Sequence, residues 1–216
     1  MLKIKEEIKL VIFDLDGTLI NAYNAIASSF NYVMRRFGLP QQNAEDIRKA
    51  VGWGDSNLLK PFLNKEDLKD GLRLYRRHHQ VSLTKQALLY PGVRRLLEYL
   101  KDKGYKLAVA SNRPTRFSLI ILRVLKIRSY FNYVLCADKL KRGKPHPQIL
   151  NLIRKRFHYK PAEVLYVGDM VIDLLAGERA GVRTILVTTG SSSKKEIAKH
   201  NPYLSILRVS DLRKIL

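Results

Sequence analysis

Short apolar runs alternate with longer segments of helical periodicity along most of the chain. Runs of strand length, rich in aliphatic side chains, occupy residues 8–13, 106–110, 133–136, 164–167 and 184–187. Segments with helical spacing lie between or beside them, at residues 93–103, 116–125, 147–157 and 173–180. A short helix near residues 194–199, a further strand and a last helix complete the pattern. Repeated strand–helix–strand units predict a parallel sheet with helices on both faces.

A long helical block interrupts this alternation after the first predicted strand. Its first part, residues 22–37, has apolar side chains at helical spacing, and Gly38-Leu39-Pro40 ends it. Residues 41–87 are also helical in pattern, are broken by glycine and proline, and contain no good strand. We therefore expect an α/β fold, a doubly wound, Rossmann-like parallel sheet formed by residues 1–20 and 88–216. Residues 21–87 are expected to form an inserted helical cap.

The composition fits a folded protein without membrane spans or a disulfide framework. The apolar fraction of 46% and the charged fraction of 27% are ordinary for a globular chain and argue against disorder. No apolar run approaches the roughly 18–20 residues that cross a bilayer. The start of the chain lacks the features of a signal peptide, and Cys136 is the one cysteine. We expect a cytoplasmic protein without a membrane partner, as a monomer or a homodimer.

Charge is the unusual feature of the composition. The chain has 40 Lys and Arg against 19 Asp and Glu, which gives a net charge of +21. Residues 139–162 contain basic side chains but no acidic one. Such a charge attracts anions, among them phosphate groups and nucleic acid. A solvated basic surface is the simpler interpretation, and no motif that reads RNA or DNA accompanies the run.

Two aspartates follow the first predicted strand. Asp14 and Asp16 stand two positions apart in Asp14-Leu15-Asp16-Gly17-Thr18, so their side chains can face the same crevice. Ligands of doubly wound sheets lie at the carboxyl ends of the strands, where this pair falls. Two carboxylates there can bind a divalent cation, or one can be a nucleophile while the other moves a proton. A polar Asp-Gly turn is the alternative that the motif alone leaves open.

Other predicted strand ends and loops carry polar groups as well. Ser111 and Asn112 follow the second predicted strand, where a hydroxyl and main-chain N–H groups can bind phosphate or cap a helix. Lys144 lies on a loop stiffened by two prolines and is either a fixed inward charge or a surface lysine. Asp169 follows the fourth predicted strand, and Asp173 lies one helical turn further on, where it can share the crevice or complement the helix dipole.

Taken in chain order, these groups resemble the four motifs of the haloacid-dehalogenase-like superfamily of hydrolases. Residues 14–18 are similar to its first motif, Ser111 to its second, Lys144 to its third and residues 168–173 to its fourth. The resemblance covers the core, whereas the cap is similar to the family only in being helical. The stretch Gly143-Lys144-Pro145-His146-Pro147 and the pair Pro91-Gly92 resemble the phosphoglycolate-phosphatase-like branch of the superfamily, whose helical cap follows the first motif.

The resemblance implies a Mg²⁺-dependent phosphatase that hydrolyses a small phosphomonoester. In that scheme Asp14 attacks phosphorus and becomes an aspartyl-phosphate, while Asp16 protonates the leaving oxygen and then deprotonates water. The residues it assigns to Mg²⁺ are Asp14, Asp16 through its main-chain carbonyl, Asp169 and Asp173. It implies that Asp173 orients Lys144 or a metal-bound water. The residues it assigns to the phosphoryl oxygens are Thr18, Ser111, Asn112 and Lys144. Because Asp16 is present, the dehalogenase activity of other members is not expected.

The cap is expected to select the substrate. Trp53, in Gly52-Trp53-Gly54, is a candidate for binding it, with a core tryptophan at a helix–helix turn as the alternative. Several cap arginines can meet a substrate carboxylate or simply be solvated; they are Arg35, Arg36, Arg73, Arg76 and Arg77.

Three other functions stay open at this point. A sugar phosphomutase would share the aspartyl-phosphate but return the phosphoryl group to a sugar. A phosphonate-cleaving enzyme would need a cap lysine that forms a Schiff base, for which the candidates are Lys49, Lys60, Lys65 and Lys69. The positive charge also admits a nucleic-acid-binding protein or a phosphatase that processes nucleic-acid ends, although the small phosphate ester is the favoured partner.

Overall fold

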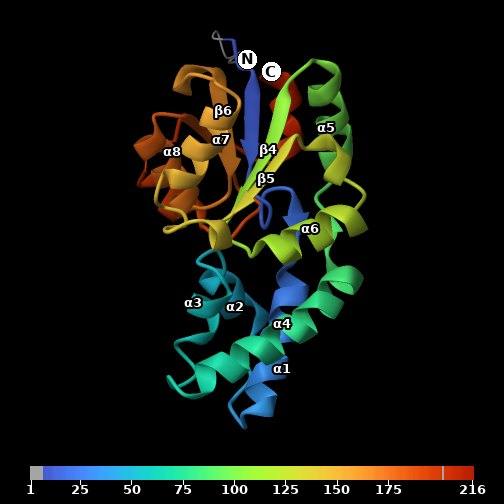
Figure 1. Ribbon diagram of the computed structural model, residues 1–216, viewed down its shortest axis with the longest axis vertical. Helices are drawn as coiled ribbons and strands as arrows, with labels where there is room; N and C mark the ends of the chain where they lie inside the picture. Colours follow the sequence, from blue (N-terminus) through green and yellow to red (C-terminus); the bar gives the residue numbers. More distant parts are fainter. Residues whose placement is uncertain (1–6, 201) are drawn as a thin grey trace.

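A six-stranded parallel sheet forms the centre of the protein. The computed structural model describes residues 7–200 and 202–216. The strands lie in the order β5-β4-β1-β6-β7-β8, and all neighbours run parallel (Figure 1). Their bounds are β1 Leu10–Phe13, β4 Lys106–Ser111, β5 Tyr133–Cys136, β6 Val164–Gly168, β7 Arg183–Val187 and β8 Leu204–Ile206. The chain adds strands outward on one side of β1 and then on the other, and such a switch point opens a crevice at the carboxyl ends.

Helices cover both faces of the sheet, because successive strand residues point to opposite sides. The core helices are α5 Val93–Asp102, α6 Thr115–Val124, α7 Gln148–Arg156, α8 Val171–Ala180 and the 3₁₀ helix η4 Val209–Lys214. Val11 and Phe13 of β1 pack in one core with α5, α6 and η4. Leu10 and Ile12 pack in a second core with α7 and α8, which lie on the other side of the sheet in Figure 1. The predicted doubly wound α/β fold is confirmed.

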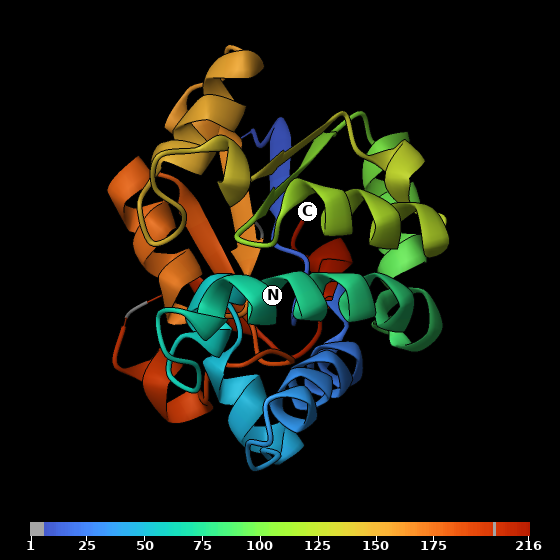
Figure 2. The same ribbon diagram turned by 60° about the horizontal axis from the view of Figure 1, so that its bottom comes forward.

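Four helices form a separate layer beyond the carboxyl ends of the strands. They are α1 Tyr23–Arg36, α2 Ala44–Ala50, α3 Asp55–Leu59 and α4 Asp67–Gln86. Figure 2 shows α4 lying across this layer beside α1, with the sheet behind them. The layer buries its own apolar side chains, among them Phe30 and Val33 of α1 and Tyr75 and Leu83 of α4. We propose that it is the cap, as the helical pattern of residues 21–87 indicates.

A two-stranded antiparallel sheet lies where the chain leaves the core and returns to it. β2 (Ile20–Asn21) pairs with β3 (Leu88–Leu89), which holds the two connections side by side. The apolar pattern does not predict this sheet, because two residues per strand are too few to show an alternation. Its position supports the proposed division of the chain at residues 20–21 and 87–88.

The structure differs from the predicted elements mainly at their ends. β1 begins at Leu10 rather than at residue 8, and the last predicted helix is a 3₁₀ segment. The helix α9 (Lys194–Ala198) lies where the pattern places it. Residues 1–6, which the predicted core includes, lie outside the described residues.

The acid-free run of residues 139–162 falls on a loop, α7 and the turn that follows. Lys141, Arg142 and Lys155 of this run are exposed, which agrees with the interpretation as a solvated basic surface. Within residues 7–200 and 202–216, no helix combines the length and apolar character needed to cross a membrane.

Candidate active site

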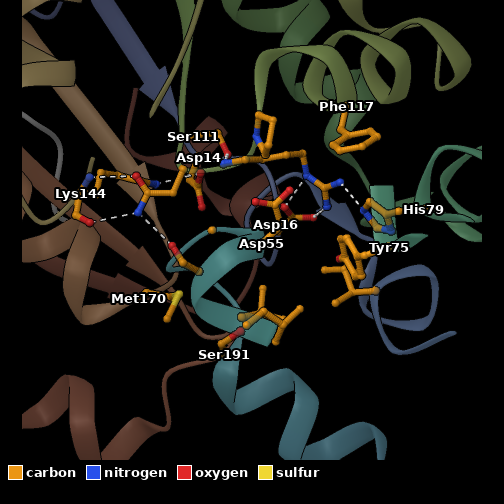
Figure 3. A pocket seen from close by; sticks show the side chains of 18 residues that line it. Asp14, Asp16, Asp55, Tyr75, His79, Ser111, Phe117, Lys144, Met170 and Ser191 are labelled. Carbon is orange, nitrogen blue, oxygen red and sulfur yellow. Dashed lines mark hydrogen bonds and ion pairs between the residues drawn. The ribbon is translucent and has the colours of Figure 1, made fainter. Parts of the chain in front are cut away.

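Three neighbouring strand ends bring the predicted site residues together. Asp14 follows β1, Ser111 ends β4 and Asp169 follows β6, and β1 pairs with both of the other strands. All three side chains are buried. A cavity lies beside them, and the predicted residues that line it are Asp14, Asp16, Ser111, Asn112 and Lys144 (Figure 3). The strand order alone therefore assembles most of the predicted site.

Lys144 is the cation at the centre of this group. Its Nζ lies 2.9 Å from Asp14 Oδ1 and 2.7 Å from Asp173 Oδ1. It also donates to the Ala110 carbonyl at 3.2 Å and to the Tyr166 hydroxyl at 3.0 Å. Burial by itself lowers the pKa of an ammonium group, but the charges of Asp14 and Asp173 outweigh it and raise the pKa of Lys144. Lys144 is thus a fixed internal charge, and the alternative of a surface lysine is wrong.

Asp173 forms a buried ion pair with Lys144. Its Oδ1 accepts from Lys144 Nζ and, at 2.6 Å, from the Tyr166 hydroxyl. Its Oδ2 accepts from the main-chain N–H groups of Asp169 at 3.2 Å and Met170 at 3.0 Å. Both oxygens are therefore engaged. Asp173, like Asp169, does not line the cavity. These contacts favour the predicted role of orienting Lys144 over direct binding of a metal ion.

Asp169 is fixed from two sides. Its Oδ1 accepts from Thr18 Oγ1 at 3.1 Å, and its Oδ2 accepts from the main-chain N–H of Ser191 at 2.9 Å. A Cβ added at Gly17 or Gly190 would collide with this carboxylate, so both glycines permit its close approach. Thr18 is fully buried and does not line the cavity. The structure thus places the Thr18 hydroxyl on Asp169, whereas its predicted contact with phosphate has no support here.

Asp14 and Asp169 are placed to hold a divalent cation, with the Asp173 carboxylate close to both. One carboxylate oxygen of each lies within 4.8 Å of the others, and all three side chains are buried. Burial raises the pKa of Asp14 to about 6 against the opposing charge of Lys144. Burial and the neighbouring carboxylates raise the pKa of Asp169 well above its usual value. Apart from its ion pair with Lys144, Asp14 Oδ1 has no hydrogen-bond partner. One lysine does not balance three carboxylates, so oxygen ligands are available for a hard cation.

Asp16 is paired with Arg113, a residue for which we predicted no role. Arg113 Nε donates to Asp16 Oδ2 at 2.8 Å, and Nη2 donates to Oδ1 at 2.6 Å. The remaining nitrogen, Nη1, lies 2.9 Å from Nε2 of His79 on cap helix α4, so Asp16 and His79 flank one guanidinium in Figure 3. Arg113 follows the second motif by two positions. Among 40 basic residues, nothing but that position distinguishes it in the sequence.

The cap residues predicted to bind substrate lie outside the cavity. Trp53 is 48% exposed and does not line the cavity, whereas its neighbours Gly52 and Gly54 do. None of the five predicted cap arginines lines it either. Arg76, for example, pairs with Asp55 at 2.7 Å and is half exposed. The cap lines the cavity with apolar side chains, with glycines and with the polar side chains of Asp55, Tyr75 and His79, rather than with the predicted indole and guanidinium groups.

Core and cap meet around a cavity of about 60 Å³. Asn112 Nδ2, at the end of β4, donates to the Gly52 carbonyl of the cap at 2.9 Å. In the other direction, Arg48 of α2 donates to the carbonyls of Thr189 and Gly190, both at 2.8 Å. These contacts hold the cap over the carboxylates and shield them from bulk water.

Replacing Tyr166 with phenylalanine is expected to lower the free energy of unfolding by about 1–3 kcal/mol. The change removes the hydroxyl that accepts from Lys144 and donates to Asp173, so two buried charges lose a neutral partner. Urea unfolding monitored by circular dichroism measures the loss. Tyr133→Phe is the matched control, because Tyr133 is only half buried on β5, at the edge of the same sheet. Equal stabilities of the two variants would contradict the network.

Comparison with known proteins identifies the family of this chain. The family model of haloacid dehalogenase-like hydrolases matches residues 11–187. The chain is 34% identical to the phosphoglycolate phosphatase of Haemophilus influenzae, over 91% of this chain and 92% of that relative. It is 31% identical to the phosphoglycolate phosphatase of Aquifex aeolicus, with 96% of each chain covered.

A solved structure shows the same architecture. The crystal structure of a predicted phosphoglycolate phosphatase from Haemophilus somnus 129pt is similar with a TM-score of 0.92 and 30% identity. The similarity covers 97% of this chain and 98% of the other, so it includes the sheet and the helical layer above it. The chain belongs to the haloacid dehalogenase-like hydrolase family and is a phosphatase of phosphoric monoesters.

Proposed function

We propose that this protein hydrolyses 2-phosphoglycolate to glycolate and phosphate, with Mg²⁺ as its metal ion. The relatives from Haemophilus influenzae and Aquifex aeolicus are phosphoglycolate phosphatases, which suggests this substrate. The size of the cavity supports a substrate this small. The volume of about 60 Å³ is far below the roughly 300–1,000 Å³ of sites for drug-sized ligands. A short ester matches such a space under the cap better than a nucleotide or a nucleic-acid end does.

Asp14 is the nucleophile of the proposed reaction. It lines the cavity, and its ion pair with Lys144 favours the ionised carboxylate in spite of burial. Attack of a carboxylate oxygen on phosphorus breaks the bond between phosphorus and the glycolate oxygen and forms an aspartyl-phosphate. The Ser111 hydroxyl and Lys144 lie at the same strand ends and are placed to bind the phosphoryl oxygens.

Asp16 moves the proton in both steps. It first gives a proton to the departing glycolate oxygen. It then accepts a proton from the water that attacks the phosphorus of the aspartyl-phosphate, which releases phosphate and restores Asp14. The Asp16 carboxylate lines the same cavity as Asp14, as this division of roles requires.

Asp14, Asp169 and the main-chain carbonyl of Asp16 are the groups that we propose for Mg²⁺. When bound, Mg²⁺ neutralises part of the negative charge that a phosphoryl group brings to these carboxylates. Thr18 and the Ser191 N–H orient Asp169, and Asp173 orients Lys144. The metal ligands and the groups that orient them therefore come from different parts of the chain.

Removal of divalent cations is expected to abolish phosphate release, and Mg²⁺ is expected to restore it. Thr18→Val removes the hydroxyl that orients Asp169 and is expected to weaken Mg²⁺ binding roughly 10–100-fold. Calorimetric titration with Mg²⁺ and the Mg²⁺ dependence of turnover both measure this. Thr115→Val, on the partly exposed start of α6, is the control. Full activity in the presence of a chelator contradicts the metal assignment.

A panel of esters tests the proposed substrate. 2-Phosphoglycolate is compared with 3-phosphoglycerate, glycerol 3-phosphate, glucose 6-phosphate and AMP, with free phosphate as the readout. We expect 2-phosphoglycolate to have the highest kcat/KM, by about tenfold or more, as one unmatched buried polar group already costs this much. A larger ester that matches or exceeds it contradicts the proposal.

Product analysis with a sugar bisphosphate tests the phosphomutase alternative. A phosphomutase would convert a sugar bisphosphate to an isomeric sugar phosphate, whereas we expect only free phosphate. The lysines considered for a Schiff base, Lys49, Lys60, Lys65 and Lys69, are all exposed, although such a lysine needs a desolvated pocket. The predicted monomer or homodimer stays a prediction.

A further inference from the structure

We propose that Arg113 recognises a second anionic group of the substrate, the carboxylate in 2-phosphoglycolate, and that binding this group releases Asp16 from Arg113. The inference rests on the proposed function, since it needs a small phosphomonoester with a second negative charge. It assigns a specificity-determining role to a core residue instead of to the predicted cap arginines.

Two basic side chains line the cavity, and each is paired with a carboxylate. Among the described residues that line it, the lysine and arginine side chains are Lys144 and Arg113. Lys144 is held between Asp14 and Asp173, so its charge belongs to the end where the phosphoryl group reacts. Arg113 pairs with Asp16 and faces the cap. A short substrate with one anion at each end matches this arrangement.

Arg113 is held rigidly by both the core and the cap. Its main-chain N–H donates to Ser111 Oγ at 3.2 Å, and its Nη1 donates to His79 Nε2 at 2.9 Å. Ser29 Oγ donates to the Ala25 carbonyl at 2.7 Å and therefore accepts, at 3.2 Å, from His79 Nδ1. This chain of hydrogen bonds leaves Nε2 of His79 without a proton, so it can accept from the guanidinium. A docked cap thereby orients the guanidinium.

The surroundings of Arg113 strengthen its pairing with a carboxylate. The residue is 8% exposed. His79 stacks on Tyr75 with ring centres 4.9 Å apart and meets the edge of Phe117 at 5.3 Å, and all three rings lie on one side of the cavity in Figure 3. Charge-assisted pairs are stronger away from water. The fork of a guanidinium also selects groups that present two oxygens in one plane.

Asp16 can act on a proton only when this ion pair opens. Both of its oxygens accept from Arg113, at 2.8 Å and 2.6 Å, whereas proton transfer needs one oxygen within reach of the leaving group. A substrate carboxylate has the same two-oxygen geometry as Asp16 and can replace it on the guanidinium. An ester without a second anion leaves the pair closed and is expected to turn over slowly even when it binds.

A pair of esters of equal length tests this exchange. 2-Phosphoglycolate carries the carboxylate, and 2-hydroxyethyl phosphate carries a hydroxyl in its place. In Arg113→Gln, we expect kcat/KM for 2-phosphoglycolate to fall on the order of 10²–10³-fold. We expect kcat for 2-hydroxyethyl phosphate to rise, because Arg113 no longer holds the Asp16 carboxylate. Arg123→Gln, an exposed arginine of α6, is the control and is expected to change neither.

Opposite effects on the two esters are a signature that a purely structural role does not produce. If Arg113→Gln lowers turnover of both esters equally, the inference is wrong. Arg113→Lys keeps the charge but loses the fork, and it serves as the second variant should the glutamine variant fail to fold. For it we expect a smaller loss with 2-phosphoglycolate and a smaller rise with 2-hydroxyethyl phosphate.

Binding of phosphonates, which are not hydrolysed as esters, separates this inference from the proposed function. We expect wild-type protein with Mg²⁺ to bind 3-phosphonopropionate on the order of 10²-fold more tightly than propylphosphonate in calorimetry, and Arg113→Gln to lose that preference. Equal affinity of wild-type protein for both overturns the role of Arg113 whatever the substrate is. A wild-type protein that has this preference but does not hydrolyse 2-phosphoglycolate supports Arg113 and contradicts the proposed function.

Discussion

Replacing Asp14 with asparagine is expected to abolish phosphate release and to leave the fold intact. An amide oxygen is too weak a nucleophile to form the acyl phosphate, so we expect kcat to fall by roughly 10⁴-fold or more, as for other nucleophile deletions. Asparagine has nearly the same volume as aspartate. It also removes one of three buried carboxylates that lie within 4.8 Å of one another, and we expect an equal or higher Tm in metal-free buffer.

Three measurements check the role of Asp14. Phosphate release gives kcat, thermal unfolding gives Tm, and acid quenching of the wild-type protein with ³²P-labelled substrate traps the aspartyl-phosphate. The trapped label is expected in wild-type protein and not in Asp14→Asn. Asp102→Asn, at the exposed end of α5, controls for the loss of a negative charge. Turnover of Asp14→Asn within tenfold of wild type would show that another group attacks phosphorus.

The residues that follow strands could be predicted because the fold places them. Asp14, Ser111 and Asp169 each stand at the end of an apolar run, and parallel strands bring their carboxyl ends to one edge. Their convergence thus follows from the alternation of strands and helices and needs no knowledge of side-chain contacts. The position of Lys144 could not be predicted from the strands, because it lies on a loop that is not a strand end. Only the resemblance of its motif to the family distinguished it from the surface lysines around it.

The contacts between core and cap could not be predicted in this way. Arg113 and His79 meet at 2.9 Å because the cap docks at a particular angle, and no periodicity encodes that angle. For the same reason the sequence does not say which side of the Gly52–Gly54 turn faces the cavity. The glycines line it, and Trp53 turns outward. Substrate-selecting residues depend on such docking, which explains why the predicted cap residues were the weakest part.

Replacing Lys144 with methionine is expected to destabilise the protein by roughly 3–5 kcal/mol in metal-free buffer, the usual cost of breaking a buried ion pair. Methionine fills much of the space but leaves Asp14 and Asp173 without their shared cation, whose Nζ lies 2.9 Å and 2.7 Å from them. Catalytic activity is expected to disappear as well. Whole domains are stable by only about 5–15 kcal/mol. The loss expected for Lys144→Met is therefore a large part of the total free energy of unfolding.

A matched pair of lysines on one loop makes this test sharp. Lys141, three residues earlier, is exposed, and Lys141→Met is expected to change the unfolding midpoint in urea very little. Mg²⁺ should raise the Tm of Lys144→Met more than that of wild type, because a cation restores positive charge among the same carboxylates. If Lys144→Met unfolds during expression, Lys144→Arg keeps the charge and is expected to fold with reduced stability. Equal unfolding midpoints for the two methionine variants would mean that Lys144 is not the charge on which the buried carboxylates depend.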